Sequence, residues 1–162
     1  MKIILFDLGN TLEHVVQNKH VLMPDAVELL SAVKDMRDHN GDRPVLSLVS
    51  DFPDPAEKYY AILHDLTLDV FFEPLKERVT LSSEVGVMKP DEKIFRAAID
   101  KIQSGLPYQN VLFITEDKEH TIQARRLGMM TIRLKHEEEY AEVDKLIEMV
   151  PLIHLFILTS NA

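Results

Sequence analysis

The fold is decided by the stretch Lys2-Ile3-Ile4-Leu5-Phe6-Asp7-Leu8-Gly9-Asn10-Thr11. Residues 3–6 are apolar and do not alternate with polar residues, which predicts a strand that is covered on both faces. Gly9 and Asn10 then favour a turn. This places Asp7 at the carboxyl end of a buried strand, where open α/β sheets bind their ligands. An ordinary turn acid would explain Asp7 equally well by itself, so the rest of the chain has to separate the two interpretations.

Segments typical of strands and helices alternate along the chain, which predicts a doubly wound, Rossmann-like α/β fold with a parallel five-stranded sheet and helices on both faces. The expected strands cover residues 2–6, 45–49, 78–82, 111–114 and 130–134. Helices are expected to begin at Pro24, at Pro55 with Asp54 as its cap, and after Asp91, and another should end at Gly128. The other expected elements are a hairpin or flap over residues 12–23, an acid-rich helix over 137–149 and an apolar tail over 150–158.

Composition narrows the class of protein. A chain of 162 residues with 46% hydrophobic content is long enough for one domain, residues 1–162, with a sizeable core. The net charge of −9 argues against a nucleic-acid partner, and the absence of cysteine excludes disulfides and thiol chemistry. No stretch approaches the roughly 18 apolar residues of a membrane span, and no charged leader precedes the first strand. We therefore expect a cytoplasmic protein without a membrane partner.

Polar side chains also follow the later expected strands. Ser50-Asp51 follow the second strand, Lys89 lies in the loop after the third, and Glu116-Asp117 follow the fourth. Each has a structural interpretation as well: a turn serine, a solvated loop lysine, and acids that favour a helix N-terminus. It is their order and spacing that carry more information than any one of them.

Four segments together resemble the motifs of the haloacid dehalogenase-like (HAD) superfamily of hydrolases. They are residues 6–12, 48–51, 81–95 and 111–117, the last continuing to Gly128-Met129. The third segment is long and fairly specific, and all four occur in order. The resemblance implies a Mg²⁺-dependent phosphomonoester hydrolase that works through an aspartyl phosphate, on a phosphorylated small molecule or a phosphoprotein.

By this resemblance Asp7 is the nucleophile, and Lys89 neutralises charge on Asp7 and on the phosphate. Charge on the phosphate also has to be balanced by the metal ion, which prefers oxygen ligands. The implied Mg²⁺ ligands are Asp7, the carbonyl of Gly9, Glu116 and, as a substitute or outer ligand, Asp117. The implied phosphate-binding groups are Leu8, Thr11, Ser50 and Asp51.

The sequence departs from the family pattern at four positions. Phosphatases of this superfamily usually carry a second Asp two residues after the nucleophile, where this chain has Gly9. That Asp protonates the leaving group, and positioned proton transfer contributes about 10² to 10⁴ in rate. Thr115-Glu116 replace a Gly-Asp pair, in which Glu116 keeps the charge with a longer reach, and Thr121 replaces an Asp of the metal site. The pattern predicts a slow enzyme, one restricted to good leaving groups, or a non-catalytic relative that acts as a binding or regulatory module.

Residues 12–23 are too few for a cap domain, so the resemblance implies a capless member. An open site would exclude water through the flap, through a docked macromolecule, or through oligomerisation, for which the tail over 150–158 is a candidate unless it is a last core element. Both a monomer and a homo-oligomer remain open. A response-regulator-like phosphoacceptor is a further alternative, but its acidic pair has no counterpart in residues 1–4.

Overall fold

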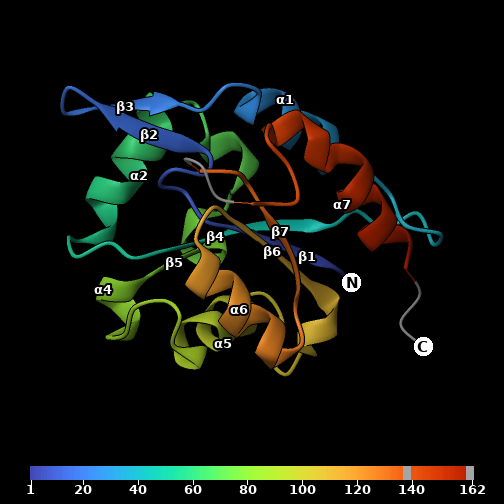
Figure 1. The fold of residues 1–162 in the computed structure, drawn as a ribbon. Coiled ribbons are helices and arrows are strands. Elements are labelled where there is room, and N and C mark those ends of the chain that lie inside the picture. The colour runs from blue at the N-terminus through green and yellow to red at the C-terminus, as the bar shows by residue number, and fades with distance from the viewer. Residues whose placement is uncertain (137–139, 160–162) are drawn as a thin grey trace.

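A parallel five-stranded sheet forms the centre of the computed structural model, which describes residues 1–136 and 140–159 (Figure 1). Its strand order is β5-β4-β1-β6-β7, with β1 in the middle. The strands are β1 (Ile3–Phe6), β4 (Val45–Ser50), β5 (Val79–Leu81), β6 (Val111–Thr115) and β7 (Met130–Arg133). The chain builds outward from β1 on one side and then on the other. The crevice at the carboxyl ends of β4, β1 and β6 is therefore the switch point at which such sheets bind ligands.

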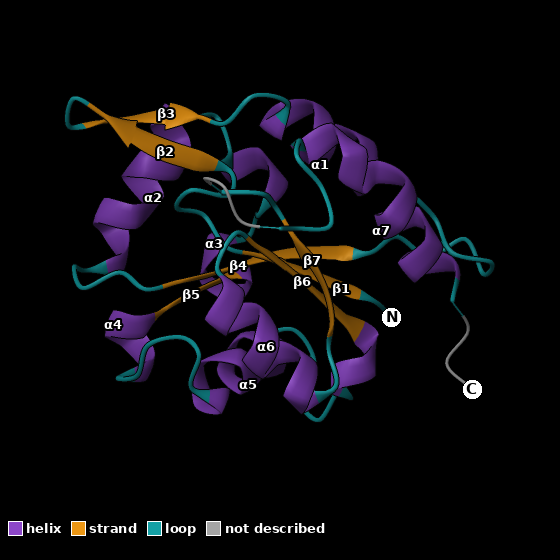
Figure 2. Cartoon of the chain, in the orientation of Figure 1, coloured by secondary structure: helices purple, strands orange, loops and turns teal. Residues whose placement is uncertain are grey.

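Helices cover both faces of this sheet, as the sequence predicts (Figure 2). One face carries α1 (Ala26–Lys34), α2 (Ala56–Asp65) and α7 (Met149–Leu158), and the other carries α5 (Glu92–Asp100) and α6 (Lys118–Leu127). The central strand shows why its residues are uniformly apolar: Ile4 and Phe6 pack into the first core, and Ile3 and Leu5 into the second. The short helices are η1 (Asp69–Phe71), α3 (Leu75–Arg78), α4 (Ser82–Val85), η2 (Tyr108–Asn110) and η3 (Leu146–Glu148).

The predicted flap is a two-stranded antiparallel hairpin. It consists of β2 (Glu13–Val16) and β3 (Lys19–Leu22), in which Glu13 pairs with Leu22. Gln17 and Asn18 form its tip with φ of 50° and 63°, as a two-residue turn that follows the strand twist requires. The hairpin joins β1 to α1, and in Figure 1 it lies beside α2.

Two of the expected helix termini are confirmed, and one expected helix cap is wrong. α6 ends at Gly128 with φ of 98°, and Asp91 caps α5 by accepting a hydrogen bond from the Lys93 amide. The predicted Asp54 cap of α2 is wrong, because Pro55 occupies the cap position and no side chain caps this helix. The Asp54 carboxylate instead forms an ion pair with Lys58, which removes it from the helix end.

The predicted helix over 137–149 is wrong over residues 140–145, whereas 146–148 form the short helix η3 and Met149 begins α7. Residues 137–139 lie outside the described residues. Val143 pairs with Leu134 at the end of β7, and the Glu142 carboxylate accepts a hydrogen bond from the Arg133 amide. These tertiary contacts outweigh the helix propensity of an acid-rich segment. The apolar tail is α7, whose Ile153, Phe156 and Ile157 are buried, so it is a core element. No helix in the described ranges is both long and apolar enough for a transmembrane span.

Candidate active site

Asp7 and Lys89 form a buried ion pair at the crevice. Asp7 follows β1 directly and Lys89 comes from the loop before α5, yet Lys89 Nζ lies 2.6 Å from Asp7 Oδ1. Each residue is only 7% exposed. Lys89 Nζ also donates to the carbonyl of Val49 at 3.2 Å, at the end of β4. Because removal of two charges from water is costly, such a pair is stable only with close contact and further hydrogen bonds, both of which are present.

The loop that carries Lys89 is held by Asp51. The Asp51 carboxylate accepts a hydrogen bond from the Lys89 amide at 2.8 Å. The family resemblance implies that the amides around Leu8 and Asp51 bind phosphate; the Asp51 side chain has the separate task of positioning the lysine. The Leu8 amide donates to Asp7 Oδ1 at 2.9 Å, so in this structure it supports the Asp7 carboxylate.

Ser50 lies at the end of β4, where its hydroxyl meets the phenol of Tyr59 from α2 at 2.5 Å. Both residues are buried. Burial raises the pKa of the Tyr59 phenol, and the negative charges of Asp7 and Glu13 raise it further, whereas the hydrogen bond to Ser50 lowers it. The phenol therefore keeps its proton, and either hydroxyl can be the donor in this contact. When the phenol donates to Ser50, the Ser50 proton is available for an anion in the pocket.

Glu116 approaches Asp7 from the end of β6 through two threonine hydroxyls. Thr11 Oγ1 donates to Glu116 Oε2 at 2.9 Å and accepts from the Glu116 amide at 3.2 Å. Thr115 Oγ1 donates to Asp7 Oδ2 at 3.0 Å and lies 3.4 Å from Glu116 Oε2. Thr11 thus holds Glu116 and does not face the pocket, while Thr115 joins the two carboxylates.

The charges on this side are not balanced. Burial raises the pKa of Glu116, and the charge of Asp7 raises it further, against the lowering effect of the Thr11 hydrogen bond and the Lys89 charge. Two carboxylates therefore share a single nearby ammonium group. A hard cation with oxygen ligands would relieve this excess charge, so the donor chemistry of Asp7 and Glu116 fits Mg²⁺.

The other residues expected at the metal site are engaged elsewhere. Asp117 caps α6, since its Oδ1 accepts from the His120 amide at 2.9 Å. Thr121 Oγ1 donates to the Asp117 carbonyl at 2.7 Å within the first turn of the same helix. Among the residues that the structure describes, no group of three or more His, Cys, Asp or Glu side chains is arranged around a metal position. Asp7 and Glu116 are therefore the two carboxylates that lie together, whereas one oxygen of Asp117 is used in the helix cap.

A pocket of about 240 Å³ opens beside Asp7. Six of the residues expected at the site form part of its wall, and they are Asp7, Leu8, Gly9, Ser50, Asp51 and Lys89. The other residues of the wall were not expected from the sequence, and they are Glu13, His20, Phe52, Tyr59, Ile62 and His120. Tyr59 was hidden in an amphipathic helix pattern, and the hairpin residues had no motif. The one available signal was an acid, Glu13, four residues after a glycine that replaces an acid.

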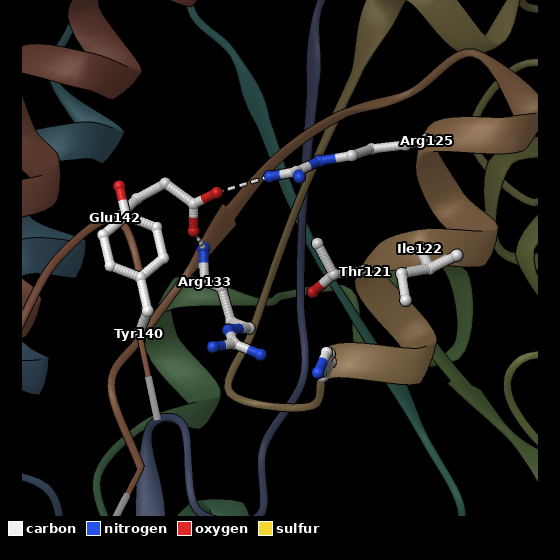
Figure 3. Close-up of a pocket in the computed structure, with 7 residues that line it drawn as sticks. Thr121, Ile122, Arg125, Arg133, Tyr140 and Glu142 are labelled. Atoms are coloured by element: carbon white, nitrogen blue, oxygen red, sulfur yellow. Dashed lines mark hydrogen bonds and ion pairs between the residues drawn. The ribbon is translucent and has the colours of Figure 1, made fainter. Parts of the chain in front are cut away.

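A larger pocket of about 390 Å³ lies between α6 and the segment after β7 (Figure 3). Arg125 donates to Glu142 there, and Glu142 accepts from the Arg133 amide. These contacts attach residues 140–145 to β7. Within its described lining no carboxylate is paired with a lysine, as Asp7 is with Lys89. The smaller pocket is therefore the candidate active site.

Comparison with known proteins identifies the fold. No family model and no curated protein matches this sequence. Among solved structures, a HAD hydrolase of family IA, variant 3, from Entamoeba histolytica matches with a TM-score of 0.71 at 12% identity, over 97% of this chain and 99% of that chain. A HAD-superfamily hydrolase from Ehrlichia chaffeensis matches with a TM-score of 0.67 at 16% identity, also over 97% and 99%.

A HAD hydrolase from Bacillus subtilis, in a magnesium-bound form, matches with a TM-score of 0.63 at 18% identity, over 82% of this chain and 56% of that chain. At such identities the likeness establishes the fold and leaves the activity open. The sheet order, the buried acid after β1 and these matches agree: the chain has the fold of the haloacid dehalogenase-like superfamily.

Proposed function

We propose that this protein is a phosphomonoester hydrolase that uses Asp7 as its nucleophile. The observation that carries the proposal is the buried contact of 2.6 Å between Lys89 Nζ and Asp7 Oδ1, in a pocket at the switch point of the sheet. A carboxylate that attacks an anionic phosphate ester needs positive charge beside both groups. Lys89 is placed to supply it.

The reaction proceeds in two steps in this proposal. A carboxylate oxygen of Asp7 attacks phosphorus and the bond from phosphorus to the alcohol oxygen breaks, which leaves a phosphoryl group on Asp7. Water then attacks phosphorus, the bond to Asp7 breaks, and inorganic phosphate leaves. Lys89 and the Ser50 hydroxyl hold the phosphate oxygens in both steps, while Tyr59 keeps the Ser50 proton directed at them.

Mg²⁺ is the metal that we propose for the site, held by the carboxylates of Asp7 and Glu116. Three observations support it: an all-oxygen donor set, the raised pKa of Glu116 beside Asp7, and the magnesium bound in the Bacillus subtilis structure of the same fold. When bound, such an ion neutralises charge on the transferring phosphoryl group. Thr121 and the engaged carboxylate of Asp117 reduce the ligand set, so we expect weak binding.

The proposed substrate is a phosphorylated small molecule or a phosphorylated protein side chain. The pocket of about 240 Å³ is smaller than the pockets that enclose drug-sized ligands, so we propose that it holds the phosphate group and the atoms next to it. The rest of the substrate would then lie outside, along the hairpin and α2. A binding or regulatory module is the second candidate function, and it is favoured by Gly9, which puts no acidic side chain beside the nucleophile.

One experiment separates these candidates. Purified protein is incubated with p-nitrophenyl phosphate and Mg²⁺, and phosphate release is compared with that of D7N, which keeps the size of the side chain but removes the nucleophile. D54N serves as the control, because Asp54 is a half-exposed acid in a surface ion pair. Mg²⁺-dependent release that is lost in D7N and kept in D54N supports the hydrolase. Equal release from all three proteins contradicts it and favours the binding module.

A further inference from the structure

Gly9 leaves room for a side chain on the pocket side, and a carboxylate from elsewhere lies at that position. A Cβ atom placed on residue 9 would meet Glu13 Oε1 at 3.7 Å, an ordinary van der Waals distance. Gly9 and Glu13 both line the pocket beside Asp7. The hairpin therefore delivers an acid to the region that an acidic side chain at residue 9 would occupy.

The turn after β1 fixes this placement. The Leu8 carbonyl accepts hydrogen bonds from three successive amides, those of Thr11, Leu12 and Glu13, at 3.2, 2.9 and 3.1 Å. The chain consequently doubles back, and Glu13 forms a bridge with Gly9. Pairing of β2 with β3 then holds Glu13 opposite Leu22. The backbone turn and the strand pairing thus hold residue 13 beside the pocket.

Glu13 is unusually buried for an acid, at 5% exposure. Its Oε2 lies 3.0 Å from His20 Nδ1 on β3, and the His20 side chain is 40% exposed. The two carboxylate oxygens thus have different surroundings: Oε1 lies beside Gly9 in the pocket, and Oε2 contacts an imidazole that reaches solvent. This arrangement connects the pocket to water through one carboxylate and one ring.

We infer that Glu13 is the acid and base of the reaction, in place of the aspartate that Gly9 replaces; this inference rests on the proposed function. In the first step the Glu13 carboxyl gives its proton to the alcohol oxygen as the bond to phosphorus breaks. In the second step the carboxylate takes a proton from the attacking water, which restores the acid. His20 exchanges protons between Oε2 and solvent.

The other ionisable groups of the pocket have different tasks. Lys89 is bound to Asp7, the Asp51 carboxylate accepts the Lys89 amide, and the Tyr59 phenol bonds with Ser50. His120 is the rival donor, since it lines the pocket and its Nδ1 is buried without a hydrogen bond among the described residues. Glu13 is favoured over His120 because its carboxylate lies beside the position that a side chain on residue 9 would occupy.

The first test compares leaving groups. An alkyl phosphate needs its leaving oxygen protonated, whereas p-nitrophenolate leaves without help. We expect E13Q to lower kcat/KM for the alkyl phosphate by about 10² or more and that for p-nitrophenyl phosphate by less than about tenfold. H120Q should lower both by a similar small factor. An equal loss of both activities in E13Q, no loss at all, or a selective loss in H120Q instead, would overturn the assignment.

The second test is rescue. A Cβ atom on residue 9 meets no atom closer than 3.7 Å, so the backbone at this position accepts a side chain. In E13Q/G9D we expect the alkyl phosphatase activity to return by roughly tenfold or more over E13Q, whereas G9D alone should gain little because two carboxylates then compete for one place. A gain in G9D that is the same with and without Glu13 would contradict the inference.

Controls distinguish failure of this inference from failure of the proposed function. If the wild type is active, D7N is inactive and E13Q is unimpaired, only the role of Glu13 is contradicted. Release of phosphate that does not depend on Asp7 would contradict both the role of Glu13 and the proposed hydrolase function. Thermal unfolding confirms that each variant is folded, and if E13Q is not, H20Q decides, because its exposed position tolerates change. H20Q should show the same selective loss on the alkyl phosphate; equal loss on both substrates counts against the relay.

Discussion

The two sides of the pocket hold their polar groups in different ways. On the Lys89 side, formed by the end of β4 and the loop before α5, a buried ammonium group contacts Asp7, and Asp51 secures the loop. On the Glu116 side, formed by the end of β6 and the start of α6, the hydroxyls of Thr11 and Thr115 connect the carboxylates.

In the proposed function this difference would separate binding of the phosphate from binding of the metal. The Lys89 side is complete without a ligand, because every charge on it has a close partner. On the Glu116 side burial, and then the charge of Asp7, raise the pKa of Glu116. In the proposed function a phosphate would therefore meet a preorganised surface, whereas a metal ion would balance the charge on the other side. Changes on the Lys89 side should thus affect stability and activity together, and changes on the Glu116 side should act mainly through the metal.

The largest effect is expected for K89M. Asp7 loses its only close cation in the buried pair, and loss of one partner from such a pair costs about 3 to 5 kcal/mol. Urea unfolding should show a loss of this size, and phosphate release should disappear. The control is K93M, at an exposed lysine on α5. If K89M unfolds like the wild type, the ion pair does not have the role given to it here.

The strands and the central pair are the parts that the sequence predicts well. A strand covered on both faces shows a short, unbroken apolar run, as residues 3–6 and 111–114 do. The apolar run of α7 is longer and forms a helix, so length and the flanking turn residues also contribute to the prediction. The position of Asp7 follows from the strand that precedes it, since parallel strands place their carboxyl ends at one edge of the sheet. The pairing of Asp7 with Lys89 was implied by the resemblance of the four segments to the family motifs, and the structure contains this pair.

What the sequence did not predict depends on contacts between distant residues. Residues 140–145 belong to a segment expected to be helical, but Val143 pairs with Leu134 at the end of β7 instead. Local helix propensity does not reveal such a contact. The Asp54 carboxylate forms an ion pair with Lys58 on α2 and does not cap this helix. Tyr59 and Glu13 were missed because their roles arise only when α2 and the hairpin pack against the end of β1. Local patterns therefore located the elements, and packing determined which side chains reach the pocket.

Restoration of an acid should sharpen the contrast between the two sides. T121D returns a carboxylate to the first turn of α6, next to Asp117, where helix polarity favours negative charge. Groups that support a metal site typically change affinity by about 10- to 100-fold. We expect the Mg²⁺ concentration for half-maximal activity to fall by roughly tenfold, with little change in the limiting rate. S104D adds the same charge at a remote loop and should leave this Mg²⁺ concentration unchanged. An equal fall in T121D and S104D would show that only the net charge of the protein matters.

A smaller effect is expected on the Lys89 side for Y59F. The phenol is buried against Ser50, and loss of such a hydrogen bond costs about 1 kcal/mol. Without this partner the Ser50 hydroxyl is free to rotate, so KM for a phosphate ester should rise several-fold while kcat changes less. Steady-state kinetics together with thermal unfolding measure both effects. Y60F removes a hydroxyl from the neighbouring residue and is the matched control. An unchanged KM in Y59F would show that Tyr59 has only a packing role.

The smallest effect concerns the charge on Glu116 and has a defined sign. The pKa of Glu116 is raised from its ordinary 4.5 by burial and by Asp7, so the folded protein binds this proton more tightly than the unfolded chain does. Metal-free protein should therefore lose stability as the pH rises from about 4.5 through the folded pKa. E116Q has no such proton, and its unfolding should depend less on pH in that window and be slightly more resistant at neutral pH. Mg²⁺ should raise the melting temperature of the wild type at pH 7 and leave that of E116Q unchanged, because the surplus charge that attracts the ion is gone. Urea or thermal unfolding from pH 4 to 8 measures both responses. If the stability of the wild type relative to E116Q rises across this window, Glu116 is not the source of the charge imbalance.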